Sequence, residues 1–124
     1  MELNESCTVK FLPAAINDMS EIISSFAMLG SKQGAQRIRS KMIKASEQIK
    51  AHPYSGVTVP DEKLAKSGYR MLVVESYLMF YKVFDEAKQV IFYRVVNGKR
   101  NFPMLFSRLH EDFSKGEQLL VDRK

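Results

Sequence analysis

Few residues of the sequence could transfer a proton or bind a phosphate, and most of them are basic. Lys99 and Arg100 follow the last apolar run of the sequence, Arg94 lies within that run, and Lys82 lies within the run before it. Cleavage of a phosphodiester needs a group that takes a proton and cations that hold the phosphate as negative charge develops. These four cations fit the second requirement. They fit equally well a surface that binds acidic residues of a partner, or only water.

His52 is the best-placed ordinary general base. It lies before a proline, where a helix has to end, and a histidine there also interacts favourably with the helix dipole. His110 has no partner evident in the sequence. No glycine-rich phosphate loop, Ser-His-Asp order or metal-ligand spacing is present, and Cys7 is the single cysteine. We therefore expect no structural metal and no cofactor.

The basic charge is clustered along the chain. The net charge is +5, and six Lys or Arg stand against the single acid Glu47 between Lys32 and Lys50. Such clustering indicates an anionic partner, either nucleic acid or an acidic protein segment, or else a solvated helix face. The apolar residues never form a run long enough to span a membrane, and the N-terminus has no apolar signal-peptide core. We expect a cytoplasmic protein.

Hydrophobic spacing predicts the elements that must position these residues. A short strand ending at Pro13 is followed by two stripes of helical period, separated by Gly30 and Ser31 as cap residues. Three apolar, β-branched and aromatic runs with short polar joints then predict an antiparallel meander. The expected ranges are a strand at 8–12, helices at 13–29 and 32–52, strands at 69–75, 77–84 and 89–96, and a short helix at 102–113.

These elements predict an α+β fold of the order β-α-α-β-β-β. An N-terminal helical hairpin would pack on one face of a small, mainly antiparallel sheet and leave the other face available. One domain is expected at 8–113, with a flexible N-terminus at 1–7 and a polar C-terminal tail at 114–124.

The side chains of the middle strand of the meander point alternately to the two faces of the sheet. Leu78, Phe80 and Lys82 share one face, and Met79, Tyr81 and Val83 share the other. If the second set packs on the helices, Leu78 and Phe80 leave apolar surface bare. A partner segment, laid across as a helix or added as a strand, would cover it.

Four segments in this order resemble the RelE/ParE superfamily of toxins. They are His52–Gly56, Gly68–Val74, Ser76–Val83 and Val90–Asn101, and the resemblance covers roughly Thr8 to Phe106. It implies a cytoplasmic, metal-free toxin of a type II toxin–antitoxin system, which arrests growth when free and forms a hetero-oligomer with a cognate antitoxin. The antitoxin-binding residues would be Leu78, Phe80, Lys82, Arg94 and Arg100.

The superfamily divides by mechanism. RelE-like members cleave messenger RNA on the ribosome, whereas ParE-like members act on DNA gyrase. The nuclease pattern is matched at Arg100 and Lys99, but Leu78 stands where a second arginine is expected and Phe106 where a tyrosine or histidine is expected. The resemblance therefore favours the ParE-like branch. An mRNA endoribonuclease, with Arg100, Lys99, Lys82, Arg94 and His52 as candidate catalytic residues, is one alternative. An inactive toxin-derived domain that only binds its antitoxin is another.

Overall fold

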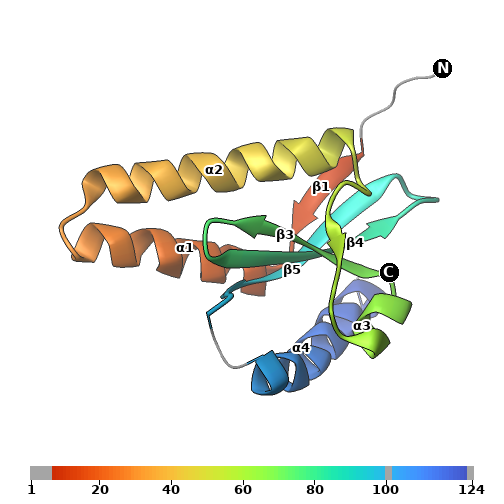
Figure 1. Cartoon of the computed structure of the whole chain (residues 1–124). Helices are drawn as coiled ribbons and strands as arrows, with labels where there is room; N and C mark the ends of the chain where they lie inside the picture. The colour runs from red at the N-terminus through yellow and green to blue at the C-terminus, as the bar shows by residue number, and fades with distance from the viewer. Residues whose placement is uncertain (1–6, 100–101, 123–124) are drawn as a thin grey trace.

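A five-stranded sheet is the centre of the structure, a computed structural model that describes residues 7–99 and 102–122. The strands are in the order β1-β5-β4-β3-β2, with β1 parallel to β5 and the other pairs antiparallel. Helices lie on both sides of the sheet (Figure 1). The elements are β1 (Thr8–Phe11), α1 (Pro13–Met28), α2 (Lys32–Ala51), β2 (Val57–Thr58), α3 (Glu62–Lys66), β3 (Tyr69–Val74), β4 (Tyr77–Phe84), β5 (Gln89–Asn97) and α4 (Phe102–Asp122).

The helical hairpin forms where it was predicted. Pro13 starts α1, because its missing N–H costs nothing in the first turn. Gly30 adopts a φ of +81° between the helices, and the Ser31 hydroxyl accepts a hydrogen bond from the backbone N–H of Gly34 at 3.0 Å. The hairpin covers one sheet face, where Met79, Tyr81 and Phe92 are fully buried against Ile38, Met42 and Ile49 of α2.

The opposite face of the sheet is covered by α4, contrary to expectation. The expected short helix at 102–113 continues without a break through residues 114–122 of the expected polar tail, and residues 123–124 lie outside the described residues. The α4 side chains Leu105, Phe106, Leu109 and Phe113 are buried against the sheet, which leaves Leu78 only 7% exposed and Phe80 fully buried. The prediction of bare apolar surface at Leu78 and Phe80 was therefore wrong, because α4 supplies the cover that a partner was expected to supply.

A β-bulge in β5 places two adjacent residues against α4. Phe80 pairs with Arg94 and Tyr81 pairs with Phe92, so Tyr93 is the extra residue of β5. Tyr93 contacts α4 through Glu117, and Arg94 contacts it through Asp112. Strict alternation along β5 would have turned one of the two side chains to the opposite face. Within the described residues, no helix is long and apolar enough to cross a membrane.

Candidate functional site

Arg94 is held between the two helical layers. Its guanidinium donates to both carboxylate oxygens of Asp18 on α1, at 2.6 and 3.0 Å, and to Asp112 on α4. The hydrogen bonds with Asp18 raise the pKa of Arg94 above its ordinary value. Asp18 also accepts the backbone N–H of Val95 at 2.9 Å, where β5 extends beyond its partner β1. Because the Arg94 guanidinium already binds two carboxylates, it is not available to bind a phosphate.

Lys82 is part of a polar cluster beneath α4. Its ammonium lies 3.1 Å from Glu117 Oε2 and stands over the rings of Tyr69 and Phe84, at 5.0 and 5.6 Å from their centroids. The hydroxyls of Tyr69 and Tyr93 donate to the same Glu117 oxygen, at 2.6 and 3.0 Å. The cluster lies beside a pocket of about 390 Å³ that Lys63, His110 and Ser114 also line.

The electrostatics of this cluster keep Glu117 charged and the tyrosines neutral. Burial by itself would raise the pKa of Glu117, but the hydrogen bonds from Tyr69 and Lys82 outweigh it, so the pKa is lowered. Burial raises the pKa of Tyr69 and of Tyr93, and the interaction with the Glu117 carboxylate raises both further. This arrangement ties α4 to β3, β4 and β5, and it leaves no phenolate at neutral pH to act as a base.

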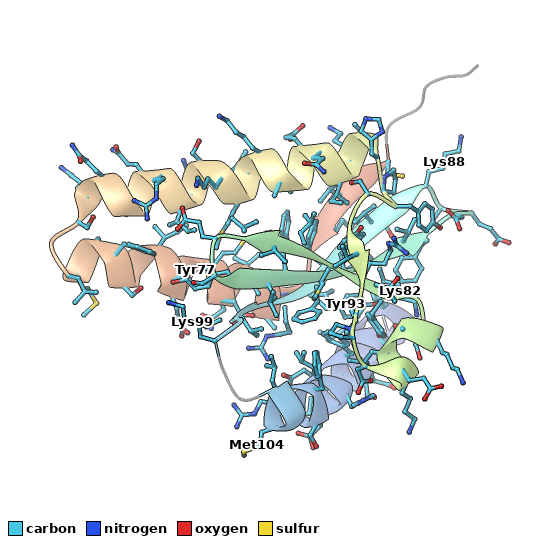
Figure 2. The ribbon with its side chains drawn as sticks, in the orientation of Figure 1. Tyr77, Lys82, Lys88, Tyr93, Lys99 and Met104 are labelled. Carbon is cyan, nitrogen blue, oxygen red and sulfur yellow. The ribbon has the colours of Figure 1, made fainter. Side chains whose placement is uncertain are left out.

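The remaining candidate catalytic residues lie elsewhere. Lys99 is exposed beyond β5, which ends at Asn97, whereas Lys82 pairs with Ile91, six residues before that end. At ~3.3 Å per strand residue this separates the two positions by roughly 20 Å, and Figure 2 shows them near opposite ends of the sheet. His52 is the exposed C-cap residue of α2, in the layer on the other side of the sheet. Arg100 lies outside the described residues.

The two positions that decide the nuclease pattern fall in one buried cluster. Leu78 on β4 and Phe106 on α4 belong to the apolar core between the sheet and α4, and they are 7% and 8% exposed. The fold therefore brings both positions to the same layer, as a shared site would require, but fills them with groups that cannot donate a proton or bind phosphate.

The sequence analysis did not predict the acidic partners of Arg94 and Lys82, which are Asp18 and Glu117. Asp18 follows the buried Ala15 by three residues, and Glu117 follows the buried Phe113 by four. An acid at helical spacing within an apolar stripe predicts a buried ion pair, so a signal was present. His110 also has a partner, since its Nε2 lies 3.0 Å from Asp61 Oδ2. Among the described residues, no group of three or more His, Cys, Asp or Glu could hold a metal.

An apolar groove lies between α1 and α2. Its volume is about 260 Å³, and Ile16 on α1 and Ile43 on α2 remain 53% and 47% exposed at its sides. Aliphatic side chains left half open in one groove make a surface that a partner can cover. The other lining residues are Phe11, Met19, Ser20, Ile23, Arg39, Met42 and Ser46.

Comparison with known proteins identifies the fold and the family. The family model described as "ParE toxin of type II toxin-antitoxin system, parDE" matches residues 9–102. The chain also resembles a solved structure of the chromosomal ParDE TA system from P. aeruginosa, with 17% identity, a TM-score of 0.60, and coverage of 74% of this chain and 96% of that one. The toxin–antitoxin complex RelBE2 from Mycobacterium tuberculosis gives 21% identity, a TM-score of 0.57, and coverage of 75% and 99%. No curated protein matches the chain. The predicted superfamily and α+β fold are thereby confirmed.

Proposed function

We propose that this chain, which belongs to the ParE toxin family of type II toxin–antitoxin systems, arrests growth by binding DNA gyrase and is neutralised by a cognate antitoxin. Inhibition by binding requires a surface of suitable shape and charge, and it requires no proton relay. Such a mechanism tolerates the ion-paired and apolar groups that this chain has between the sheet and α4.

A single observation carries the choice against RNA cleavage. Leu78 and Phe106, where the nuclease pattern has an arginine and a proton donor, are buried apolar residues. Removal of one preorganised group that stabilises developing charge costs ~10²–10³ in rate, and this chain lacks two of the expected groups. Lys82 and Arg94 do not replace them, because both are bound to carboxylates.

The antitoxin is expected to dock in the groove between α1 and α2. This groove offers half-exposed Ile16 and Ile43 next to Arg39, which fits an amphipathic helix with acidic flanks. The earlier expectation for Leu78 and Phe80 would require α4 to leave the sheet first.

Two assays run in parallel test the target. The toxin is induced in growing cells, and messenger RNA 5′ ends on ribosomes are mapped while gyrase supercoiling is measured with purified protein. We expect supercoiling to fall and to recover when antitoxin is added, with no new ribosome-dependent cuts. A known mRNA interferase serves as the positive control for cutting. New cuts with intact supercoiling would reverse the assignment, and no effect in either assay would favour an inactive, antitoxin-binding domain.

Arg100 and Lys99 provide a test at the level of residues. If they belong to a protein-binding surface, Arg100→Ala and Lys99→Ala should weaken binding to gyrase or antitoxin. Messenger RNA should remain uncut with or without these substitutions. A toxin that kills by cleavage would instead lose cutting with Arg100→Ala and keep its affinity for antitoxin.

A further inference from the structure

The whole excess of positive charge in this protein lies on α2. The helix carries six Lys or Arg and one acid, Glu47, which gives it a net charge of +5. The rest of the chain then holds thirteen basic and thirteen acidic residues, so the net charge of the full chain is also +5. A solubilising charge would be spread over the surface, whereas this one is concentrated on a single element. The six cations are Lys32, Arg37, Arg39, Lys41, Lys44 and Lys50.

Four of these six cations have no carboxylate partner among residues 7–99 and 102–122. Arg37 and Lys41 both pair with Glu75 in the turn after β3, at 2.9 and 3.2 Å. Around the other four exposed cations, no carboxylate of the described residues lies within salt-bridge distance. Like charges on neighbouring turns destabilise a helix, so folding alone gives no reason for the cluster.

The position of α2 leaves these cations accessible. The helix forms the outer layer on its side of the sheet, and its side chains extend away from the body of the molecule (Figure 2). At ~1.5 Å per residue the 20-residue helix is about 30 Å long. The exposed side of α2 is therefore a mainly cationic surface of this length, and an α-helix can lie along a nucleic-acid backbone or enter a wide groove.

The residues between the cations favour nucleic acid over an acidic protein. Gln33, Gln36 and Ser40 are exposed there, and their side chains donate hydrogen bonds. Protein interfaces draw most of their energy from a few large anchors in apolar surroundings, and this outward surface has none. Phosphate contacts need only cations and polar donors. The apolar Ile43 belongs instead to the groove shared with α1.

We propose that the outer face of α2, defined by Lys32, Gln33, Gln36, Ser40, Lys44 and Lys50, binds the phosphate backbone of nucleic acid without reading its sequence. This inference goes beyond the proposed function, because neither gyrase inhibition nor antitoxin binding requires such a contact. Arg39 can contribute from the edge of the groove.

Salt dependence of binding tests the proposal. Fluorescence anisotropy is measured on labelled 20-base-pair DNA, duplex RNA and single-stranded RNA, with poly-L-glutamate as an acidic polypeptide. For four phosphate contacts on duplex DNA, raising the salt from ~50 to ~200 mM should weaken binding about 150-fold. We expect DNA duplexes of different sequence to bind with comparable affinity. Poly-L-glutamate should bind more weakly than any of the nucleic acids.

A charge-matched pair of variants locates the surface. The triple variant Lys32→Gln, Lys44→Gln, Lys50→Gln should reduce the salt effect to about 3- to 4-fold, as for one remaining contact. The control Lys63→Gln, Lys66→Gln, Lys115→Gln removes the same charge from exposed positions on α3 and α4 and should leave binding unchanged. Circular dichroism and antitoxin binding establish that both variants are folded.

Three results would overturn the proposal. One is that the wild-type chain fails to bind any of the nucleic acids at ~50 mM salt. Another is that the control triple loses as much affinity as the α2 triple, which would indicate an effect of net charge alone. The third is that poly-L-glutamate binds more tightly than nucleic acid and is lost with the α2 triple, which would assign the surface to an acidic protein. None of these results would affect the gyrase and messenger RNA assays, so the two proposals fail separately.

Discussion

Asp18 and Arg94 are 76 residues apart in sequence and form a bidentate ion pair across the structure, with N–O distances of 2.6 and 3.0 Å. The same carboxylate accepts the N–H of Val95, so it neutralises a cation and satisfies the free edge of β5 at once. The pair links α1 to the sheet, and the bond from Arg94 to Asp112 extends the link to α4. This relationship gives Arg94 a structural role that its position in a basic cluster did not suggest.

Asp18→Ala should lower the free energy of unfolding by about 2–4 kcal/mol, because it leaves a partly buried guanidinium and a strand N–H without their main acceptor. Asp112→Ala should cost less, since Arg94 keeps both bonds to Asp18. Urea unfolding followed by circular dichroism measures both variants. Equal losses would mean that the two carboxylates hold Arg94 interchangeably.

Glu117→Gln should remove part of the acid sensitivity of the protein. The pKa of Glu117 is lower in the folded state than its ordinary value of 4.5, so its contribution to stability is complete above that value and is lost as the pH falls through the folded pKa. The wild type should lose stability across this acid window more steeply than the variant. Unfolding free energies between pH 3 and pH 7 provide the comparison, and parallel curves would contradict the prediction.

Tyr69 and Tyr93 should resist ionisation in the native protein. Burial and the Glu117 carboxylate raise the pKa of both, so the native state is favoured below the ordinary value of 10.0 and loses this advantage as the pH rises above it. Phenolate absorbance at pH 10.5 should be clearly smaller for the native protein than for the protein in denaturant. If this difference in absorbance is undiminished in the double variant Tyr69→Phe, Tyr93→Phe, it arises from other tyrosines.

Gly116→Ala should destabilise the contact between α4 and the sheet. A Cβ at this position would stand 2.8 Å from Leu12 Cδ1 and 2.9 Å from Tyr93 Cδ2. The overpacking should cost about 1–3 kcal/mol, against ~1 kcal/mol gained from the better helix propensity of alanine. Thermal unfolding would detect the loss. Lys115→Ala, at the preceding exposed position, should be close to neutral, and a stabilised Gly116→Ala variant would show that α4 has room to shift.

Ile16→Ser, Ile43→Ser should weaken antitoxin binding at least tenfold, which corresponds to ~1.4 kcal/mol, without unfolding the toxin. The matched control is Met28→Ser, Leu29→Ser, which removes two even more exposed apolar side chains at the end of the hairpin. Isothermal titration calorimetry with the antitoxin compares the pairs. A larger effect of the control would place the antitoxin at the tip of the hairpin.

Much of the fold followed from local patterns, and the largest error of the prediction concerns the length of the C-terminal helix. The stripes of α1 and α2, the caps at Gly30 and Ser31 and the three strands of the meander are local features, and each formed as predicted. The predicted helix ended at residue 113 and a polar tail was expected at 114–124, whereas α4 continues to Asp122 although glycine disfavours a helix interior, as at Gly116. In the structure Gly116 lies within α4, where the absence of a Cβ allows close contact with Tyr93. Packing therefore overrode propensity.

The sequence by itself determined the superfamily, the order β-α-α-β-β-β of the main elements and the absence of the expected nuclease groups at Leu78 and Phe106, because these depend on residue identity and short-range periodicity. It did not predict β2 as a strand of the sheet. Only the tertiary structure decided that α4 covers the sheet and that Asp18 and Glu117 neutralise Arg94 and Lys82. It also decided that, among the described residues, only two of the six cations of α2 have a carboxylate partner. The physical reason is that ion pairing and burial depend on which elements meet in space. Residues such as Asp18 and Arg94 become partners only when helices and strands far apart in the chain pack against each other.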